Sequence, residues 1–147
     1  MERIDFQKDL EKHLILQANE LKFNSSLSLP GWEHDSIDGM LSDEEIDNYI
    51  EVTSGAKNQI FGYANCVQGP MELECQLATN GIYCGDPSDY EDPKKKELES
   101  EKEDWILLFQ IDLEEDNAGM IWADVVKLYY WIRKQDLKDK NFCIQRF

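Results

Sequence analysis

The four cysteines are the side chains best suited to covalent or metal chemistry, and their spacing limits what they can do. Cys66, Cys75 and Cys84 follow one another at intervals of nine residues, and Cys143 lies far along the chain. Structural zinc sites use ligand pairs about two to four residues apart, a spacing that this chain lacks. A nucleophilic cysteine needs a neighbouring base, and the only histidines are His13 and His34. We therefore interpret Cys75, which falls on an apolar helix face, as a buried thiol.

Two acids beside aromatic or glycine-rich strings suggest a second chemistry. Asp86 ends the turn that also holds Tyr83 and Cys84, and Asp124 closely follows Trp122. Desolvation would suit such an acid to general acid–base catalysis, whereas acids in turns commonly cap backbone N–H groups. Cys84, Asp86 and Asp124 are therefore the catalytic candidates of an enzyme or a small-ligand binder, with Tyr83 and Trp122 lining its pocket. The absence of a phosphate loop or serine elbow favours a protein that is not an enzyme.

A third candidate is a metal loop. Asp112, Glu114 and Asp116 alternate oxygen-bearing side chains in the manner of a calcium loop. Gly119 is misplaced for an EF-hand, and the flanking residues are typical of strands. The sequence therefore favours a solvated hairpin turn over a cation site, and we expect no cofactor.

The net charge of −16 is concentrated in two blocks. Residues 33–51 hold eight acids and no Lys or Arg, and residues 86–116 hold thirteen acids against four lysines. Such a field repels nucleic acid and anionic membranes, so we expect neither as a partner. A basic protein is the partner that this charge would attract, although the same charge also serves solubility alone. The sequence shows no export signal or transmembrane run, which together with free thiols predicts a cytoplasmic protein.

Several elements must position these residues. The spacing predicts a short amphipathic helix within 1–18, and the alternation over 20–29 predicts a strand that ends at Pro30. A capping box at Ser42–Glu45 predicts a helix to about residue 53. Further helices are predicted from Pro70 to about residue 80, from Pro93 to about Ser100, and, as a helix or turn, over 134–140.

The strands are predicted mainly in the second half of the chain. Five successive apolar residues, Trp105 to Phe109, indicate a strand to Ile111 that is buried on both faces. Residues 120–123, 127–132 and 142–147 are interpreted as further strands. Within 127–132 and the residue that follows, Tyr129, Trp131 and Arg133 share one face, which is equally consistent with core packing and with a binding surface.

Longer strings of this chain resemble a known family. They are Gln59-Ile60-Phe61-Gly62-Tyr63, Val67-Gln68-Gly69-Pro70-Met71, Asn80-Gly81-Ile82-Tyr83-Cys84-Gly85-Asp86, Asp104-Trp105-Ile106-Leu107-Leu108-Phe109-Gln110-Ile111-Asp112 and Gly119-Met120-Ile121-Trp122-Ala123-Asp124. Together they resemble the C-terminal half of the YwqG-like family, a bacterial group of unknown function. The resemblance implies an α+β fold of mostly antiparallel sheet with a few short helices, and it implies no catalytic residues.

The same resemblance bears on domain organisation. It implies one YwqG-like C-terminal-half domain over 1–147, in which residues 1–19 are a divergent N-terminal extension. Family members usually carry an additional N-terminal half, so this chain is expected to expose apolar surface or a sheet edge. A homo-oligomer mate, another protein or residues 1–18 themselves would then cover that surface.

Three functional hypotheses follow. The first is an acidic protein-binding module, such as an inhibitor or immunity protein that captures a basic, nucleic-acid-acting protein. The second is the small-ligand binder or enzyme based on Cys84, Asp86 and Asp124, and the third is a truncated paralogue that pairs with a full-length relative. The residues expected to bind a partner are Asp35, Asp38, Asp43, Glu44, Asp47, Glu114, Glu115, Asp116, Tyr129 and Trp131.

Overall fold

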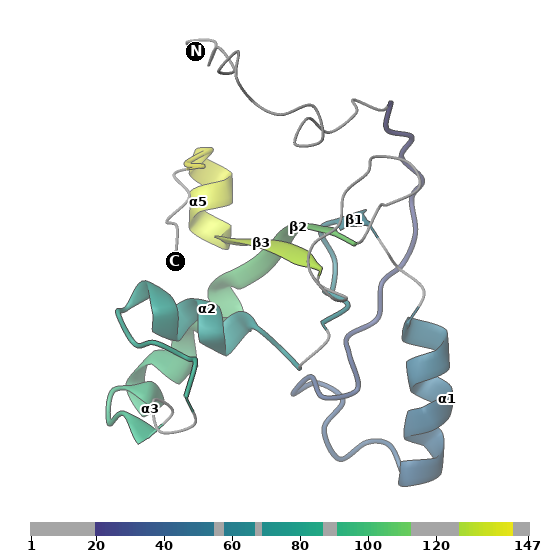
Figure 1. Cartoon of the computed structure of the whole chain (residues 1–147), viewed down its shortest axis with the longest axis horizontal. Coiled ribbons are helices and arrows are strands. Elements are labelled where there is room, and N and C mark those ends of the chain that lie inside the picture. The colour runs from purple at the N-terminus through teal and green to yellow at the C-terminus, as the bar shows by residue number, and fades with distance from the viewer. Residues whose placement is uncertain (1–19, 55–57, 67–68, 87–90, 113–126, 143–147) are drawn as a thin grey trace, which may run out of the picture.

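A computed structural model of the chain describes residues 20–54, 58–66, 69–86, 91–112 and 127–142. These residues form an α+β fold, as predicted (Figure 1). In chain order its elements are α1 (Asp43–Thr53), β1 (Gln59–Ile60), α2 (Glu72–Thr79), α3 (Lys95–Leu98), η3 (Glu99–Asp104), β2 (Trp105–Ile111), β3 (Leu128–Arg133) and α5 (Lys134–Asp139). The predicted helix within 1–18 and the predicted strand at 120–123 lie outside the described residues, as does all of 142–147 except Phe142.

The sheet is antiparallel, in the order β1-β2-β3, with β2 at its centre. The predicted strand at 105–111 is confirmed to the residue, and no residue of β2 is exposed. β3 was predicted within one residue at each end. On one face, Phe109 stacks on Tyr130 across the two strands, with ring centroids 4.1 Å apart. Aromatic cross-strand pairs of this kind help to fix strand register.

A β-bulge at Leu108 changes which β2 side chains share a face. Leu107 lies opposite Trp131, and Phe109 lies opposite the next β3 residue, Tyr130, so Leu108 is the extra residue. The bulge restarts the alternation of side chains. Leu107 and Gln110 consequently both lie opposite residues of the odd face of β3, and both are 1% exposed.

α2 packs against the odd face through Gln76 and Leu77, which are completely buried. The amide oxygen of Gln76 accepts hydrogen bonds from Trp105 Nε1 at 2.9 Å and from Arg133 at 3.0 Å, and its nitrogen donates to Glu101 at 2.9 Å. Every polar atom of this buried amide is thus used, which is what burial in a core requires. The helix begins at Glu72 rather than at Pro70, because the first helical bond runs from Cys75 N to Met71 O.

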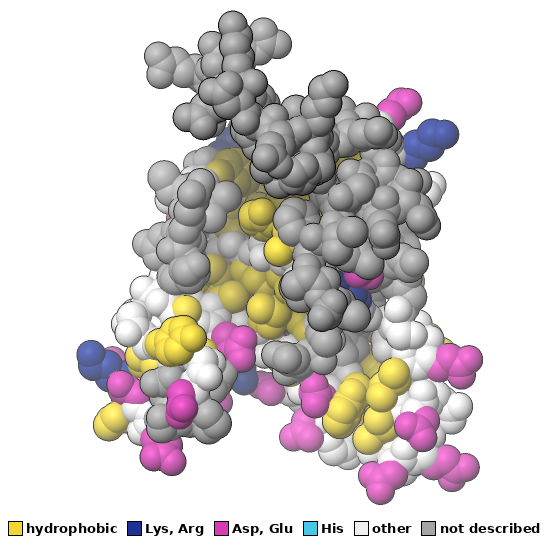
Figure 2. Space-filling model, viewed as in Figure 1, with side chains coloured by type: hydrophobic (Ala, Val, Ile, Leu, Met, Phe, Trp, Pro, Cys, Tyr) yellow, Lys and Arg dark blue, Asp and Glu magenta, His cyan; other side chains and the backbone are white. Residues whose placement is uncertain are grey.

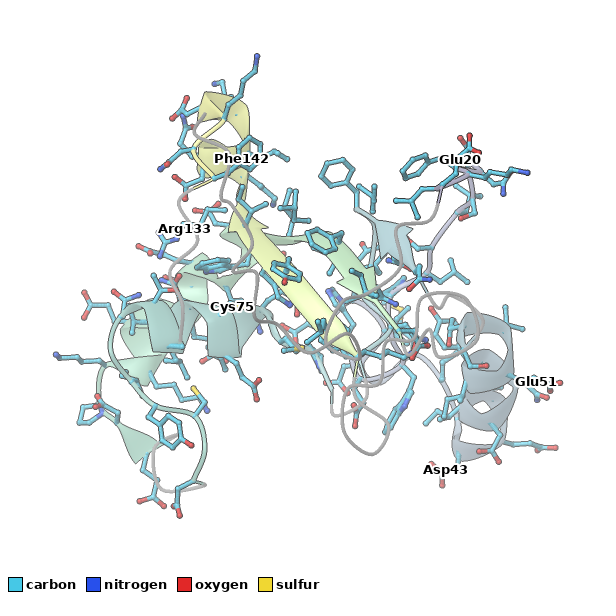
Figure 3. The ribbon with its side chains drawn as sticks, turned by 45° about the horizontal axis from the view of Figure 1, so that its top comes forward. Glu20, Asp43, Glu51, Cys75, Arg133 and Phe142 are labelled. Atoms are coloured by element: carbon cyan, nitrogen blue, oxygen red, sulfur yellow. The ribbon has the colours of Figure 1, made fainter. Side chains whose placement is uncertain are left out.

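The segment before α1 corrects a prediction. Residues 20–29 form no strand, and Leu21, Phe23 and Leu27 are exposed. Alternation makes a strand only where a neighbouring strand accepts its hydrogen bonds. Here the one described link to the sheet region is a side chain: the Tyr63 N–H donates to Ser28 Oγ at 2.9 Å. α1 itself follows as predicted and lies on the other side of the sheet from α2 and α3 (Figures 1 and 3).

Candidate functional site

The first acidic block is presented on the outside of α1 and of the turn before it. Five of the acids predicted to bind a partner are exposed there, namely Asp35, Asp38, Asp43, Glu44 and Asp47. α1 contains no Lys or Arg and no buried residue. In the space-filling view, acidic side chains surround the apolar ones over α1 (Figure 2).

Asp35 is the acid of this block that is held by a cation. Lys102 of η3 donates a hydrogen bond to its carboxylate. That bond and the charge of Lys102 hold the pKa of Asp35 below its ordinary value, although partial burial acts in the opposite direction. The contact ties the turn before α1 to the second acidic block. The three other predicted partner-binding acids, Glu114, Glu115 and Asp116, lie outside the described residues.

The capping box fixes the N-terminus of α1. The Glu45 carboxylate accepts hydrogen bonds from Ser42 N at 2.9 Å and from Ser42 Oγ at 2.7 Å. These bonds lower the pKa of Glu45. Further along, the Tyr49 hydroxyl donates to Pro30 O at 2.9 Å, which fixes α1 against the preceding loop.

A groove of about 770 Å³ lies between α1 and residues 26–34. Six large apolar side chains line it and remain exposed: Leu27 at 98%, Leu29 at 50%, Trp32 at 40%, Ile50 at 39%, Val52 at 73% and Tyr63 at 42%. An apolar surface of this kind with a polar rim is typical of an interaction site. Its polar part is acidic, since Glu33 and Glu72 line the groove and no Lys or Arg among the described residues does.

A smaller cavity of about 430 Å³ lies over the odd face of the sheet. Trp131 and Leu107 line it from β3 and β2, and Phe61, Tyr63 and Trp105 add aromatic walls. Trp131 Nε1 is buried without a hydrogen-bond acceptor. A buried donor left in this way costs about 1–3 kcal/mol.

Tyr129 and Trp131, which the sequence left between core and surface, are both half-buried. The Tyr129 hydroxyl donates to Asn65 O at 3.0 Å, and the Asn65 N–H donates to Gln110 Oε1 at 2.9 Å. Asn65 Nδ2 also donates to Thr53 O at 3.1 Å, so this network joins the end of α1 to the sheet. Tyr129 therefore has a packing role, and Trp131 faces the sheet cavity.

The catalytic candidates are not gathered at either cavity. Neither of the two cavities described here is lined by Cys84 or Asp86, and Asp124 and Trp122 lie outside the described residues. Cys84 Sγ lies 3.6 Å from Ile82 O, and Tyr83 is 76% exposed.

The other thiols are protected by burial. Cys66, Cys75 and Cys84 are free, as predicted. Burial is the main cause that raises the pKa of Cys66 and of Cys75 to about 12, and the nearby Glu72 adds to the effect. A thiol with such a pKa holds almost no thiolate at neutral pH, which agrees with the interpretation of Cys75 as structural.

Asp112 is the one member of the proposed calcium loop within the described residues. Its carboxylate lies 3.8 Å from Lys127 Nζ, and its N–H donates to Asn58 Oδ1 at 2.8 Å. Among the described residues, no group of three or more His, Cys, Asp or Glu side chains could hold a metal ion. In the same part of the chain, no helix is long and apolar enough to cross a membrane.

Sequence comparison identifies the class to which this fold belongs. The fold is an α+β domain with a three-stranded antiparallel sheet. The chain belongs to the family described as "Domain of unknown function (DUF1963)", whose model matches residues 2–145. No curated protein and no solved structure matches the chain.

Sequence reasoning found the acids of α1 but missed both cavities. The groove depends on how residues 26–34 run beside α1, which the predicted strand at 20–29 misrepresented. The sheet cavity brings together Glu72 and Lys134, which are 62 positions apart in the chain. No local pattern signals such a pairing; the aromatic and basic residues around 129–134 were the only available hint.

Proposed function

We propose that this protein is a protein-binding module, and that the groove between α1 and residues 26–34 seats an apolar, basic segment of another protein. The single observation that carries the proposal is the exposed apolar lining of this groove within an acidic segment. The family model itself names no function, so the proposal depends on this surface.

The apolar lining provides the binding energy. Burying a Val, Leu or Ile side chain completely contributes roughly 1.5–3 kcal/mol. Leu27 and Val52 are so exposed that a partner would gain most of that amount at each. α1 is 11 residues long and has no buried residue, whereas isolated helices shorter than about 12–15 residues are marginal in water. A partner that covered the helix would therefore also stabilise it.

The charge selects the kind of partner. Residues 33–51 carry eight acids and no Lys or Arg, and potentials of one sign speed the capture of oppositely charged proteins. A second copy of this chain would bring the same acids against this face, and like charges oppose that pairing. A basic protein fits the groove better than a homo-oligomer mate does.

The finer proposal concerns the role of this binding. The acidic surface supports an inhibitor or immunity protein that captures a basic, nucleic-acid-acting protein. Such a target has its own basic surface for phosphates, and the acids of α1 would occupy it. Inhibition of the captured protein's nuclease or deaminase activity is the property to measure.

The test compares matched variants in a pull-down from the native host. Ile50→Ser combined with Val52→Ser should lower the recovery of the captured protein at least tenfold. Tyr83→Ser, an exposed apolar change outside both cavities, should leave recovery unchanged. Equal recovery with both variants would contradict the proposed groove.

Charge is tested separately by association rates. Asp43→Asn, Glu44→Gln and Asp47→Asn together should slow association about tenfold at low salt and less at high salt. The matched control, Glu91→Gln with Glu97→Gln and Glu99→Gln, removes the same charge from the second acidic block. Equal slowing by both sets would mean that net charge, rather than α1, attracts the partner. A concentration-dependent dimer that Ile50→Ser disperses would instead assign the groove to a second copy.

A further inference from the structure

The cavity over the sheet has a different chemistry from the α1 groove. Its floor is Leu107 and Trp131, which lie opposite each other in β2 and β3. Three further aromatic rings complete the walls, from Phe61, Tyr63 and Trp105. At about 430 Å³ it falls within the range of small-molecule sites, about 300–1,000 Å³.

One donor in this cavity has no acceptor. Trp131 Nε1 is buried without a partner. The neighbouring indole, that of Trp105, is satisfied because its Nε1 donates to Gln76. Buried indole N–H groups usually find an acceptor, so the exception at Trp131 indicates that the acceptor comes from outside the described residues.

Several charged groups of the cavity also lack an opposite charge among the described residues. The half-buried Glu72 makes no hydrogen bond or ion pair with any described residue. Lys134 donates to the backbone oxygen of Glu103 at 2.6 Å, and no described carboxylate pairs with it. Lys102, in contrast, is paired with Asp35 in the same lining. Glu103 also lines the cavity, and its exposed carboxylate forms no ion pair with a described residue, so the unmatched charges are two carboxylates, Glu72 and Glu103, and one ammonium, Lys134.

The fold places Glu72 and Lys134 on different elements. Gln76 holds α2 against Arg133, and Glu72 lies one helical turn before Gln76 on the same face of α2. Lys134 follows Arg133 at the end of β3. Figure 3 shows Arg133 at this end of the sheet, on the same side as α2 and Cys75. Anion and cation thus border one aromatic cavity from the helix and from the end of the strand.

We propose that this cavity binds a small apolar zwitterion, of the chemical class of an amino acid or a short peptide. Its carboxylate is held by the Lys134 ammonium and accepts from Trp131 Nε1, and its ammonium is held by the Glu72 carboxylate. The apolar body lies against the aromatic walls, which can also interact with a cation through their faces. The cavity adjoins the α1 groove, with which it shares the lining residues His34, Tyr63, Pro70 and Glu72, but binding of this ligand does not depend on a protein partner.

Titration calorimetry with the intact chain tests the charge requirement. L-phenylalanine should bind at least tenfold more tightly than its amide, which lacks the anion, and than its N-acetyl derivative, which lacks the cation. The leucine–phenylalanine dipeptide distinguishes the two kinds of zwitterion, a free amino acid and a short peptide. A peptide site should bind the dipeptide more tightly than phenylalanine, and an amino-acid site should bind phenylalanine more tightly. Binding of the amide or N-acetyl derivative as tight as that of the zwitterion would overturn the proposal, as would no binding of any probe at millimolar concentration.

Matched variants test the assigned residues. Glu72→Gln, Lys134→Met and Trp131→Phe should each weaken binding of the preferred zwitterion at least tenfold. Glu97→Gln and Lys138→Met make the same chemical changes outside the cavity lining and should leave affinity unchanged. Trp131→Phe keeps an aromatic ring and removes an N–H that has no partner among the described residues, so the unliganded variant should keep its thermal stability. Unchanged affinity in that variant would show that Trp131 Nε1 does not meet the ligand.

Discussion

Two regions of the molecule differ in how their side chains are buried: the sheet with α2, and α1 with residues 20–41. Among the described residues, the largest fully buried side chains are Leu77, Leu107, Gln76 and Gln110. All belong to α2 and β2, and the polar atoms of the two glutamines bond other parts of the chain. α1 has no buried residue, and its neighbouring segment exposes several of the largest apolar side chains. The first region is specified by contacts within the chain. The second leaves large apolar side chains exposed, and it is the region where we propose that a partner binds.

The largest expected difference between the regions is in thiol reactivity. A rise of the Cys75 pKa from about 9 to about 12 leaves roughly a thousandfold less thiolate near neutral pH. Because this folded pKa is raised, the burial stabilises the fold below about pH 9, and that contribution is lost as pH rises towards 12. Pulsed iodoacetamide at pH 8 with peptide mass spectrometry should label Cys75 rapidly in urea and very slowly without it. Fast labelling without urea would mean that α2 opens as readily as α1.

Gln76 supplies the next largest effect. Gln76→Ala removes three hydrogen bonds and leaves the Trp105, Arg133 and Glu101 groups without their partner. We expect it to lower the free energy of unfolding by about 3 kcal/mol in urea titrations. Val52→Ala, on the exposed surface of α1, should change it by less than about 0.5 kcal/mol. Similar losses in both variants would abolish the contrast between the regions.

The smallest effect concerns the cap of α1. Ser42→Ala removes the hydroxyl that donates to the Glu45 carboxylate, which should loosen the first turn of α1. Because α1 is little anchored to the sheet, the loss should appear as faster amide exchange in α1, with little change in global unfolding. Acid should act similarly, because the folded pKa of Glu45 is lowered. The stabilisation of α1 by the Glu45 carboxylate is present above the ordinary glutamate pKa, and it is lost as pH falls through the lowered value. Exchange measured at two pH values checks both expectations, and Glu44→Gln is the control for charge alone.

Local patterns in the sequence predicted much of the fold. The apolar run at Trp105 to Phe109 and the capping box at Ser42 favour a strand and a helix start through residues that are close in sequence. β2 and α1 could therefore be predicted without knowledge of their neighbours in space. The alternation over 20–29 misled because a strand also needs a pairing partner, which sequence alone does not reveal. The bulge at Leu108 and the Gln76 network depend on contacts between distant segments for the same reason.

The candidate site was predictable only in part. The charge of α1 is a local property, and those acids expected to bind a partner that lie within the described residues are exposed. The groove and the sheet cavity are formed by segments distant in sequence, such as Leu27 with Val52 and Glu72 with Lys134. Their lining could be named only after the fold had placed these segments together.

Hydrogen exchange of the chain, free and bound to its captured protein, tests the central claim most directly. In the free chain, amides of α1 should exchange much faster than those of β2 and β3. Binding should then raise protection over α1 and residues 26–34 and leave the sheet unchanged. A rise confined to the sheet, with α1 unchanged, would contradict the assignment of the α1 groove as the protein-binding site.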